Sequence, residues 1–174
     1  MQDTRPARRF LRAAGTPWVS RRSRAVLMLY QYERSSLLIA IRRVAALLYA
    51  TVSAGVVAFQ LALAAGAPWG EYAMGGVIPG QFPPALRIAA LVQAALLVGM
   101  AAVVMARAGI VLPGWSRVSR RLVWAVVAFA AVSLVLNLIT PSARERAIWA
   151  PVALLLLISS AVVAIQGSLN RPAK

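Results

Sequence analysis

Few side chains in this sequence could carry out acid–base or nucleophilic chemistry. Of its 174 residues only four are Asp or Glu, and none is Cys or His. The absence of those two types excludes disulfides, thiol nucleophiles, a Ser-His-Asp triad and the usual ligands of zinc, haem and iron–sulfur clusters. We therefore expect no metal and no cofactor. Two carboxylates, Glu71 and Glu145, fall in connections between long apolar runs and remain as a potential acid or base.

Glu71 lies in a segment rich in Gly and Pro, GAPWGEYAMGGVIPGQFPPALR, which runs from Gly66 to Arg87. Its glycines permit backbone angles that other residues avoid and its prolines fix others, so we predict an ordered interfacial or re-entrant turn that caps a helix bundle. Arg87, Arg144 and Arg146 are predicted on the same side of the membrane, and Glu71 could pair with any of them. The candidates for either a ligand site or an ion pair that locks the fold are Glu71, Arg87, Arg146 and Trp69.

Four uncharged apolar segments must position these loops. We place them at 44–63, 88–106, 122–139 and 148–165, with lengths of 20, 19, 18 and 18 residues. About 20 helical residues cross a hydrocarbon core of about 30 Å, and backbone groups in lipid must bond within their own segment. The composition agrees, with 61% hydrophobic residues and a mean hydropathy of +0.75. We predict an all-α fold, a four-transmembrane-helix bundle that occupies residues 37–167.

The basic residues give this bundle an orientation. The net charge is +15, and ten of the 19 basic residues precede Val44. Six more fall in the second connection and the C-terminal tail, whereas three fall in the other two connections. Because basic residues gather on the cytoplasmic side, we predict that both termini are cytoplasmic. Since most arginines outside the N-terminal segment border apolar runs, we expect the lipid bilayer as a partner and no nucleic acid.

The two ends of the chain differ from the bundle. Residues 1–36 are rich in Arg and lack a long apolar run, so we predict a basic N-terminal segment that is largely disordered or interfacial, with 25–41 as a basic amphipathic helix on the membrane surface. The apolar stretch at 25–30 is too short for a secretory signal. Residues 168–174 are predicted to form a cytoplasmic tail. The sequence leaves open whether Met1 or Met28 is the translation start.

Small and polar residues within the spans are candidates for helix packing. The first span carries alanines at four-residue spacing, which places them on one helix face where small side chains let backbones approach closely. An Ala-rich chain can also produce such spacing by chance. Gln93 and Asn137 could hydrogen-bond between helices. The candidates for helix packing are Ala46, Ala50, Ala54, Ala58, Gln93 and Asn137.

The two outer connections carry a resemblance. The residues that match are Ala67–Gly70, Gly75–Gly76, Phe82–Arg87 and Asn137–Leu154. With these, the chain resembles an uncharacterised family of small bacterial four-helix integral membrane proteins, which pairs an APWG…GG loop with an N-x-I-S/T…ER…PVAL segment before the last helix. This chain has Met74 where that family often has Trp. The resemblance implies the bacterial cytoplasmic membrane and the four-helix topology, and it implies no catalytic role.

Three functions remain open. The first is a non-catalytic structural or interaction subunit, either a homo-oligomer or a partner of another membrane protein, which the scarcity of polar groups favours. The second is an oligomeric transporter or channel component for a small solute, lined by Gln60, Gln93, Ser133 and Asn137. The lack of any charged residue at mid-membrane counts against a proton-coupled pump. The third is a lipid-directed enzyme at the outer face, for which no nucleophile or metal site is evident.

Overall fold

The computed structural model of the chain describes residues 21–169, and it describes side chains at 26–115 and 117–166. The regular elements in this range are all helical: α2 (Arg21–Ala65), η1 (Gly70–Tyr72), η2 (Met74–Gly76), α3 (Pro84–Arg107), η3 (Pro113–Trp115), α4 (Ser116–Ile139) and α5 (Ala143–Leu169). Each of the four predicted spans falls inside one α-helix. The prediction of an all-α fold is therefore confirmed.

Four helical stretches of the described chain are long and apolar enough to cross a membrane. They are Val26–Ala65, Pro84–Arg107, Arg117–Ile139 and Ala143–Gln166. Large apolar side chains on them, such as Ile88, Val92 and Leu136, are exposed. In a bilayer these side chains would contact acyl chains, which are as apolar as Leu itself. The helices fit a multi-pass membrane protein.

The chain divides into two compact units, Met1–Ala40 and Ile41–Lys174. In the first unit, residues 1–20 of the predicted N-terminal segment lie outside the described residues. From Arg21 onward that segment is helical, because α2 begins there and continues without a break to Ala65. Residues 21–36 thus belong to α2. At the other end α5 extends to Leu169, and residues 170–174 of the predicted tail lie outside the described residues.

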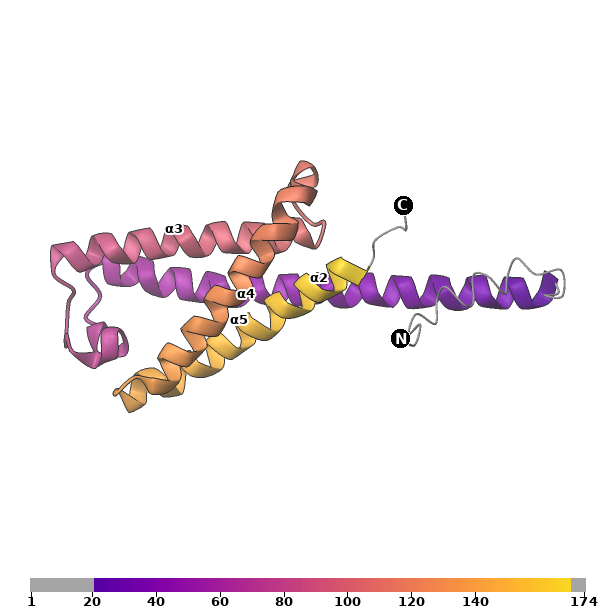
Figure 1. Cartoon of the computed structure of the whole chain (residues 1–174). Coiled ribbons are helices and arrows are strands. Elements are labelled where there is room, and N and C mark those ends of the chain that lie inside the picture. Colours follow the sequence, from indigo (N-terminus) through magenta and orange to yellow (C-terminus); the bar gives the residue numbers. More distant parts are fainter. Residues whose placement is uncertain (1–20, 170–174) are drawn as a thin grey trace. The chain divides into compact units, whose positions relative to one another are not determined.

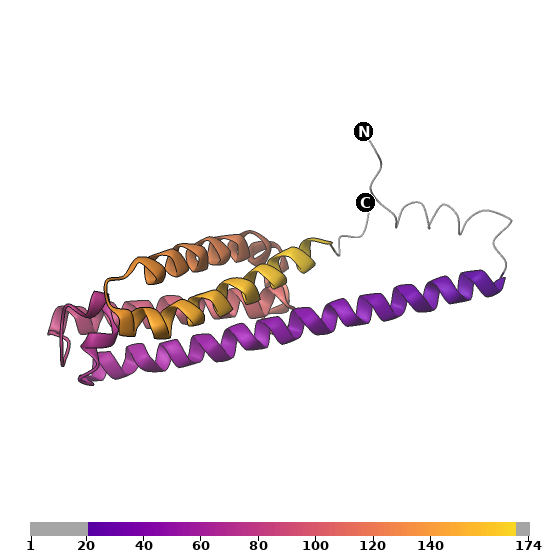
Figure 2. The same cartoon turned by 90° about the horizontal axis from the view of Figure 1, so that it is seen from below.

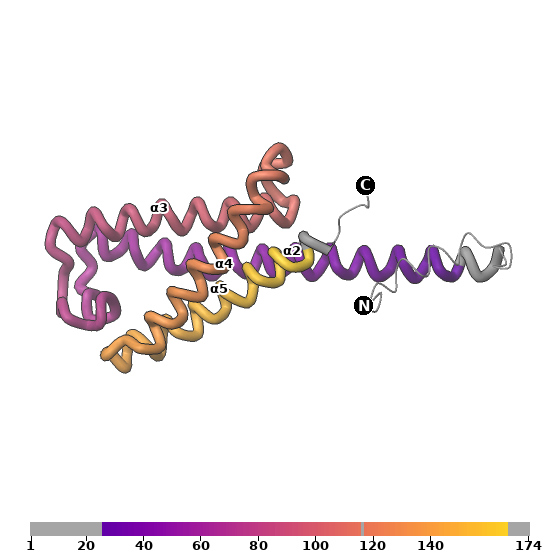
Figure 3. The backbone as a smooth tube through the Cα atoms, viewed as in Figure 1, coloured from indigo at the N-terminus to yellow at the C-terminus, as the bar shows by residue number. Residues whose placement is uncertain are grey.

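Within Ile41–Lys174, the connections alternate between two ends of the bundle. The long loop 66–83 and the turn 140–142 lie at one end, and the connection 108–115 lies at the other (Figures 1 and 3). We call the loop 66–83 the cap, and the end where it lies the capped end. Helices α4 and α5 pack side by side along their length, as a second view also shows (Figure 2). This alternation brings two loops that are far apart in sequence next to each other.

Two apolar clusters hold the bundle. The larger one lies toward the end opposite the cap and includes Tyr49 from α2, Val104 from α3 and Val123 from α4, all buried. The smaller one lies under the cap and is built on Leu63, Phe82 and Ala90. In lipid such clusters hold helices by close van der Waals packing rather than by exclusion of water.

The ends of the helices follow the predicted stop and start signals, with one exception. Gly66, at φ +98°, ends α2: its N–H bonds to Leu63 O at 3.1 Å, and Ala67 N–H bonds to Ala62 O at 2.9 Å. This is the Schellman pattern, which needs a left-handed residue and so favours glycine. Pro84 begins α3, where its missing N–H costs nothing. The exception is Pro151, which lies inside a helix. Because α5 already begins at Ala143, Pro151 is interior and leaves one carbonyl of the preceding turns without its usual N–H donor.

Gly70 is the position where the cap folds most closely on itself. Its N–H bonds to Gly80 O at 2.9 Å, and a Cβ at this position would collide with Ile78 O and approach Gly80 O to 2.8 Å. Both obstacles are backbone atoms, so they cannot swing aside as a side chain would. Only glycine fits there without opening the loop.

We expect Gly70→Ala to destabilise the protein by about 2 kcal/mol or more, because the cap must open to admit the methyl group. Gly99→Ala is the control: Gly99 lies in α3 with open space around it, and alanine is the better helix former by about 1 kcal/mol. Thermal unfolding in detergent, followed by circular dichroism, measures both variants. Equal melting temperatures for the two variants would contradict the close approach at Gly70.

Candidate functional site

Three side chains from the first two turns of α5 bond to the cap. Arg144 Nη1 donates to Glu71 Oε2 at 2.9 Å, and the N–H of Gly75 donates to Glu145 Oε2 at 2.6 Å. Trp149 Nε1 donates to Tyr72 O at 2.7 Å. These contacts join residues 70 to 77 positions apart in the chain. The beginning of α5 is thus the element that fixes the conformation of the cap.

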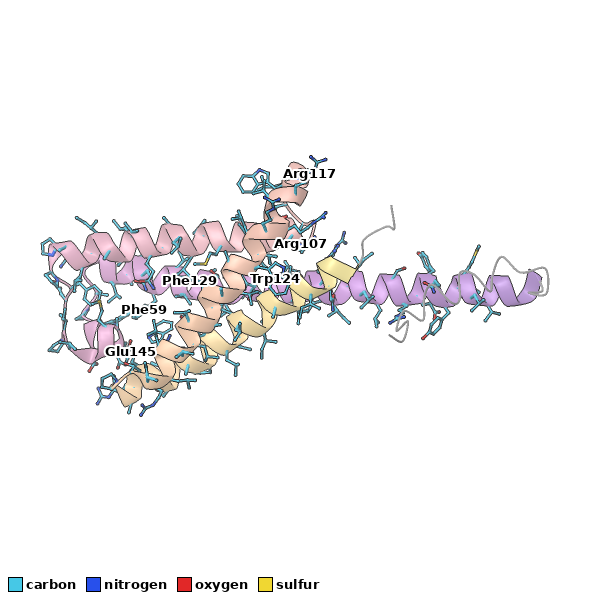
Figure 4. The ribbon with its side chains drawn as sticks, viewed as in Figure 1. Phe59, Arg107, Arg117, Trp124, Phe129 and Glu145 are labelled. Carbon is cyan, nitrogen blue, oxygen red and sulfur yellow. The ribbon has the colours of Figure 1, made fainter. Side chains whose placement is uncertain are left out.

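The buried member of this set is Glu145. It is 9% exposed, and its Oε2 also accepts a hydrogen bond from Thr140 Oγ1 at 3.2 Å. Its own N–H bonds to Ser142 Oγ at 3.3 Å, the hydrogen bond that an N-cap serine makes to the third residue of a helix. A carboxylate in the first turn of a helix is also favoured by the helix dipole. Figure 4 labels Glu145 at the capped end, close to the loop.

The ion pair between Glu71 and Arg144 is exposed. The side chains are 41% and 71% exposed, so solvent screens their attraction. Of the three arginines predicted as partners of Glu71, the structure selects Arg144. Arg146 Nη1 instead donates to Thr140 O at 3.1 Å, and Arg87 Nε donates to Phe82 O at 2.8 Å. Arg87 and Arg146 therefore each brace a turn of the backbone.

Aromatic rings join the cap to α2. Trp69 lies parallel to Phe59 with a centroid distance of 6.2 Å, and Phe59 meets Trp149 at 4.7 Å with the rings inclined by 58°. Phe59 thus links the cap to α5 through apolar contact. Trp69, a candidate site residue, remains 45% exposed.

A cavity of about 660 Å³ lies beneath the cap. Its lining comes from α2, α3, α4, α5 and the cap, and most of it is apolar. Phe59 and Phe129, two lining residues, are labelled in Figure 4. The four polar residues that we considered as a solute path all reach this cavity from three different helices: Gln60, Gln93, Ser133 and Asn137. Its volume falls in the range of small-molecule sites, about 300–1,000 Å³.

The residues predicted to pack between helices differ in how far they are buried. Ala46 is buried, Ala50 is partly buried, and Ala54 and Ala58 are exposed. Asn137 Nδ2 donates to Ser133 O at 2.8 Å within its own helix, and Gln93 is exposed at the edge of the cavity. Gln60, which is 8% exposed, is the most enclosed of the cavity amides.

Sequence reasoning missed the position of Glu145 in the fold. A serine followed three residues later by glutamate is the signature of a helix start, and it would have placed Ser142 and Glu145 at the beginning of α5. The same pattern does not reveal that this carboxylate also binds Gly75. The role of Trp149 as a donor to the cap carries no sequence signal that we can identify.

Fold and site together define an all-α protein of the multi-pass membrane type, with a braced cap at one end and an apolar cavity below it. Among the described residues, no group of three or more His, Cys, Asp or Glu side chains lies together. No protein-family model, curated protein or solved structure matches this chain.

We expect Glu145→Ala to destabilise the protein by about 2 kcal/mol, because it leaves the part-buried N–H of Gly75 without its acceptor. Glu71→Ala removes only a solvent-exposed ion pair and should cost less than about 1 kcal/mol. Thermal unfolding of both variants in the same detergent gives the comparison. A larger loss for Glu71→Ala than for Glu145→Ala would show that the buried carboxylate does not hold the cap.

Proposed function

We propose that this protein is a non-catalytic membrane subunit that contacts another membrane protein through its cap. The observation that carries the proposal is the combination of a fixed backbone with exposed apolar side chains. Trp69, Met74 and Val77 on the cap are 45%, 57% and 78% exposed. Aromatic residues and Met are enriched where proteins meet. A segment held by α5 can present them without the entropic cost of ordering a loop on binding.

The bonding of the carboxylates supports a non-catalytic role. Glu145 Oε2 already accepts two hydrogen bonds, and Glu71 is paired with Arg144. A general base needs a carboxylate oxygen that can reach a substrate proton. Here both carboxylates take part in contacts that hold the cap, which favours a structural task for each.

We further propose that the protein lies in a bacterial cytoplasmic membrane with both termini inside, as a member of the family that it resembles. The even number of membrane-crossing helices and the excess of basic residues near the termini support this orientation. The two motifs that carry the resemblance contact each other, since Glu145 from one bonds to Gly75 from the other. That contact supports treating the two motifs as one structural unit.

The orientation can be tested with single cysteines, because the chain has none of its own. Val77→Cys places a thiol on the cap, and Ile110→Cys places one in the connection at the opposite end. In intact cells we expect a membrane-impermeant maleimide to label the cysteine at 77 and not the one at 110. Both should react after the cells are lysed, which is the control for reactivity. The reverse pattern in intact cells would overturn the orientation.

The interaction surface can be tested with a photoreactive amino acid placed at 74 or 77 and, as a control, at 98. Val98 is 56% exposed on α3, away from the cap. We expect irradiation in cells to give one adduct of defined mass from positions 74 and 77, and none from 98. The Glu145→Ala exchange should weaken that adduct by releasing the cap. Equal labelling at all three positions would indicate unspecific contact and overturn the proposal.

The cavity favours a second candidate, an oligomeric transporter or channel component for a small solute. Its support is that Gln60, Gln93, Ser133 and Asn137 line one space. Transport predicts that the purified protein, reconstituted alone in liposomes, moves a solute across the bilayer. The interaction proposal predicts no such movement.

A further inference from the structure

The cavity contains a polar group whose hydrogen-bonding capacity is unused. Gln60 is 8% exposed and lines the cavity, and its side-chain amide makes no hydrogen bond to the described residues. Its amide atoms face the open cavity and have no protein partner, so their free hydrogen-bonding capacity calls for an explanation. A ligand that bonds to this amide would supply one.

The cavity is elongated along the helices. Its lining extends on α3 from Leu86 to Leu97 and on α5 from Glu145 to Leu156. At a rise of 1.5 Å per residue, this is a depth of roughly 16 Å. Apolar side chains of both core clusters form the walls, including Tyr49 at the deep end and Phe82 under the cap. Such a shape suits a chain or a narrow ring system rather than a compact polar solute.

The charges around the cavity exclude an ionic ligand. No Lys or Arg is among the described lining residues, so an anionic headgroup would find no counter-charge. The one carboxylate, Glu145, already accepts two hydrogen bonds and lies at the N-terminus of α5, where the helix dipole offsets its charge. The other polar groups are neutral amides and hydroxyls.

The entrance lies between α3 and α4. These two helices diverge from their connection toward the capped end (Figure 1). Lining residues on both remain exposed, among them Gln93 on α3 and Phe129 and Leu136 on α4. Because both helices are long and apolar enough to cross a membrane, this entrance would face the acyl chains. A ligand that enters here must therefore be dissolved in the bilayer.

We propose that this cavity binds an uncharged amphiphile from the bilayer, with an elongated apolar part and a hydroxyl, carbonyl or amide group that hydrogen-bonds to Gln60. The site does not depend on the cap being an interaction surface, and binding does not require transport. A membrane lipid and a free apolar metabolite share this chemistry, and both would compete for the same amide.

The test uses three probes with the same alkyl chain and different heads: a monoacylglycerol, the fatty acid and the alkyltrimethylammonium ion. Binding to the purified protein is measured by native mass spectrometry and by the rise in melting temperature, since a ligand of the native state stabilises it. We expect one bound monoacylglycerol per chain and saturable stabilisation, with far weaker effects from the two ions. A membrane lipid extract then distinguishes the two sources: one lipid bound from the extract indicates a resident lipid, and none bound indicates a free apolar ligand.

Variants of residues that line the cavity test whether the probe binds there. Gln60→Leu keeps the volume and removes the amide, and it should weaken monoacylglycerol binding about five- to tenfold, the effect of losing one hydrogen bond in an apolar site. Ala130→Phe fills the cavity from a buried lining position and should abolish binding. Its control is Ala128→Phe, an exposed position on the same helix outside the lining. Unchanged monoacylglycerol binding in both Gln60→Leu and Ala130→Phe would overturn the proposal. Equal binding of the three probes, which differ only in their head groups, would also overturn it. Either result would leave the cap cross-linking untouched.

Discussion

The buried side chain of Glu145 connects three parts of the chain: the cap, the turn before α5 and the first turn of α5. It accepts hydrogen bonds from Gly75 in the cap and from Thr140 in the turn before α5, while its own N–H bonds to Ser142. The contact between the cap and the α4–α5 turn thus depends on one acceptor with little exposure to water. Where water is scarce a hydrogen bond is stronger, and an unmatched donor is correspondingly costly. The ion pair of Glu71 and the indole bond of Trp149 add to an arrangement that this carboxylate makes possible.

The cavity is a consequence of how the bundle is held at its two ends. Near the α3–α4 connection the helices meet in a continuous apolar cluster around Val104 and Val123. At the capped end a small cluster around Phe82 joins α2 to α3, Phe59 of α2 contacts Trp149 of α5, and hydrogen bonds to the cap add to these contacts. Hydrogen bonds fix positions without filling space. Helices secured in this way can remain apart between the two clusters, and Gln60 lies in the space that results.

The same constraint separates the two tasks that we propose. The cap exposes Trp69 and Val77, which do not line the cavity, whereas exposed lining residues of the cavity lie on α3 and α4. One surface suits a partner protein and the other suits a molecule dissolved in the bilayer. Glu145 lines the cavity and also holds the cap, and residues of the cap itself, such as Ala73 and Met74, line the cavity too.

The sequence by itself determined the helices. Long uncharged runs place the four spans, because lipid leaves the backbone no other partners than its own helix. Gly66 and Pro84 mark where α2 ends and α3 begins, since each suits a backbone angle that the turn requires. A helix was predicted at 25–41, but its unbroken continuation into the first span was not, because Arg42 and Arg43 separate the basic stretch from the apolar run.

Only the tertiary structure decided which groups meet. Arg87, Arg144 and Arg146 are equivalent partners for Glu71 by composition and predicted side of the membrane, and the fold selects Arg144 by placing the start of α5 beside the cap. Contacts between Glu145 and Gly75, or between Trp149 and Tyr72, join positions more than 65 residues apart. A pattern along the chain reports local geometry, whereas these pairs depend on how four helices pack. The cavity around Gln60 is of the same kind, because an empty space is a property of the packing and has no residue of its own.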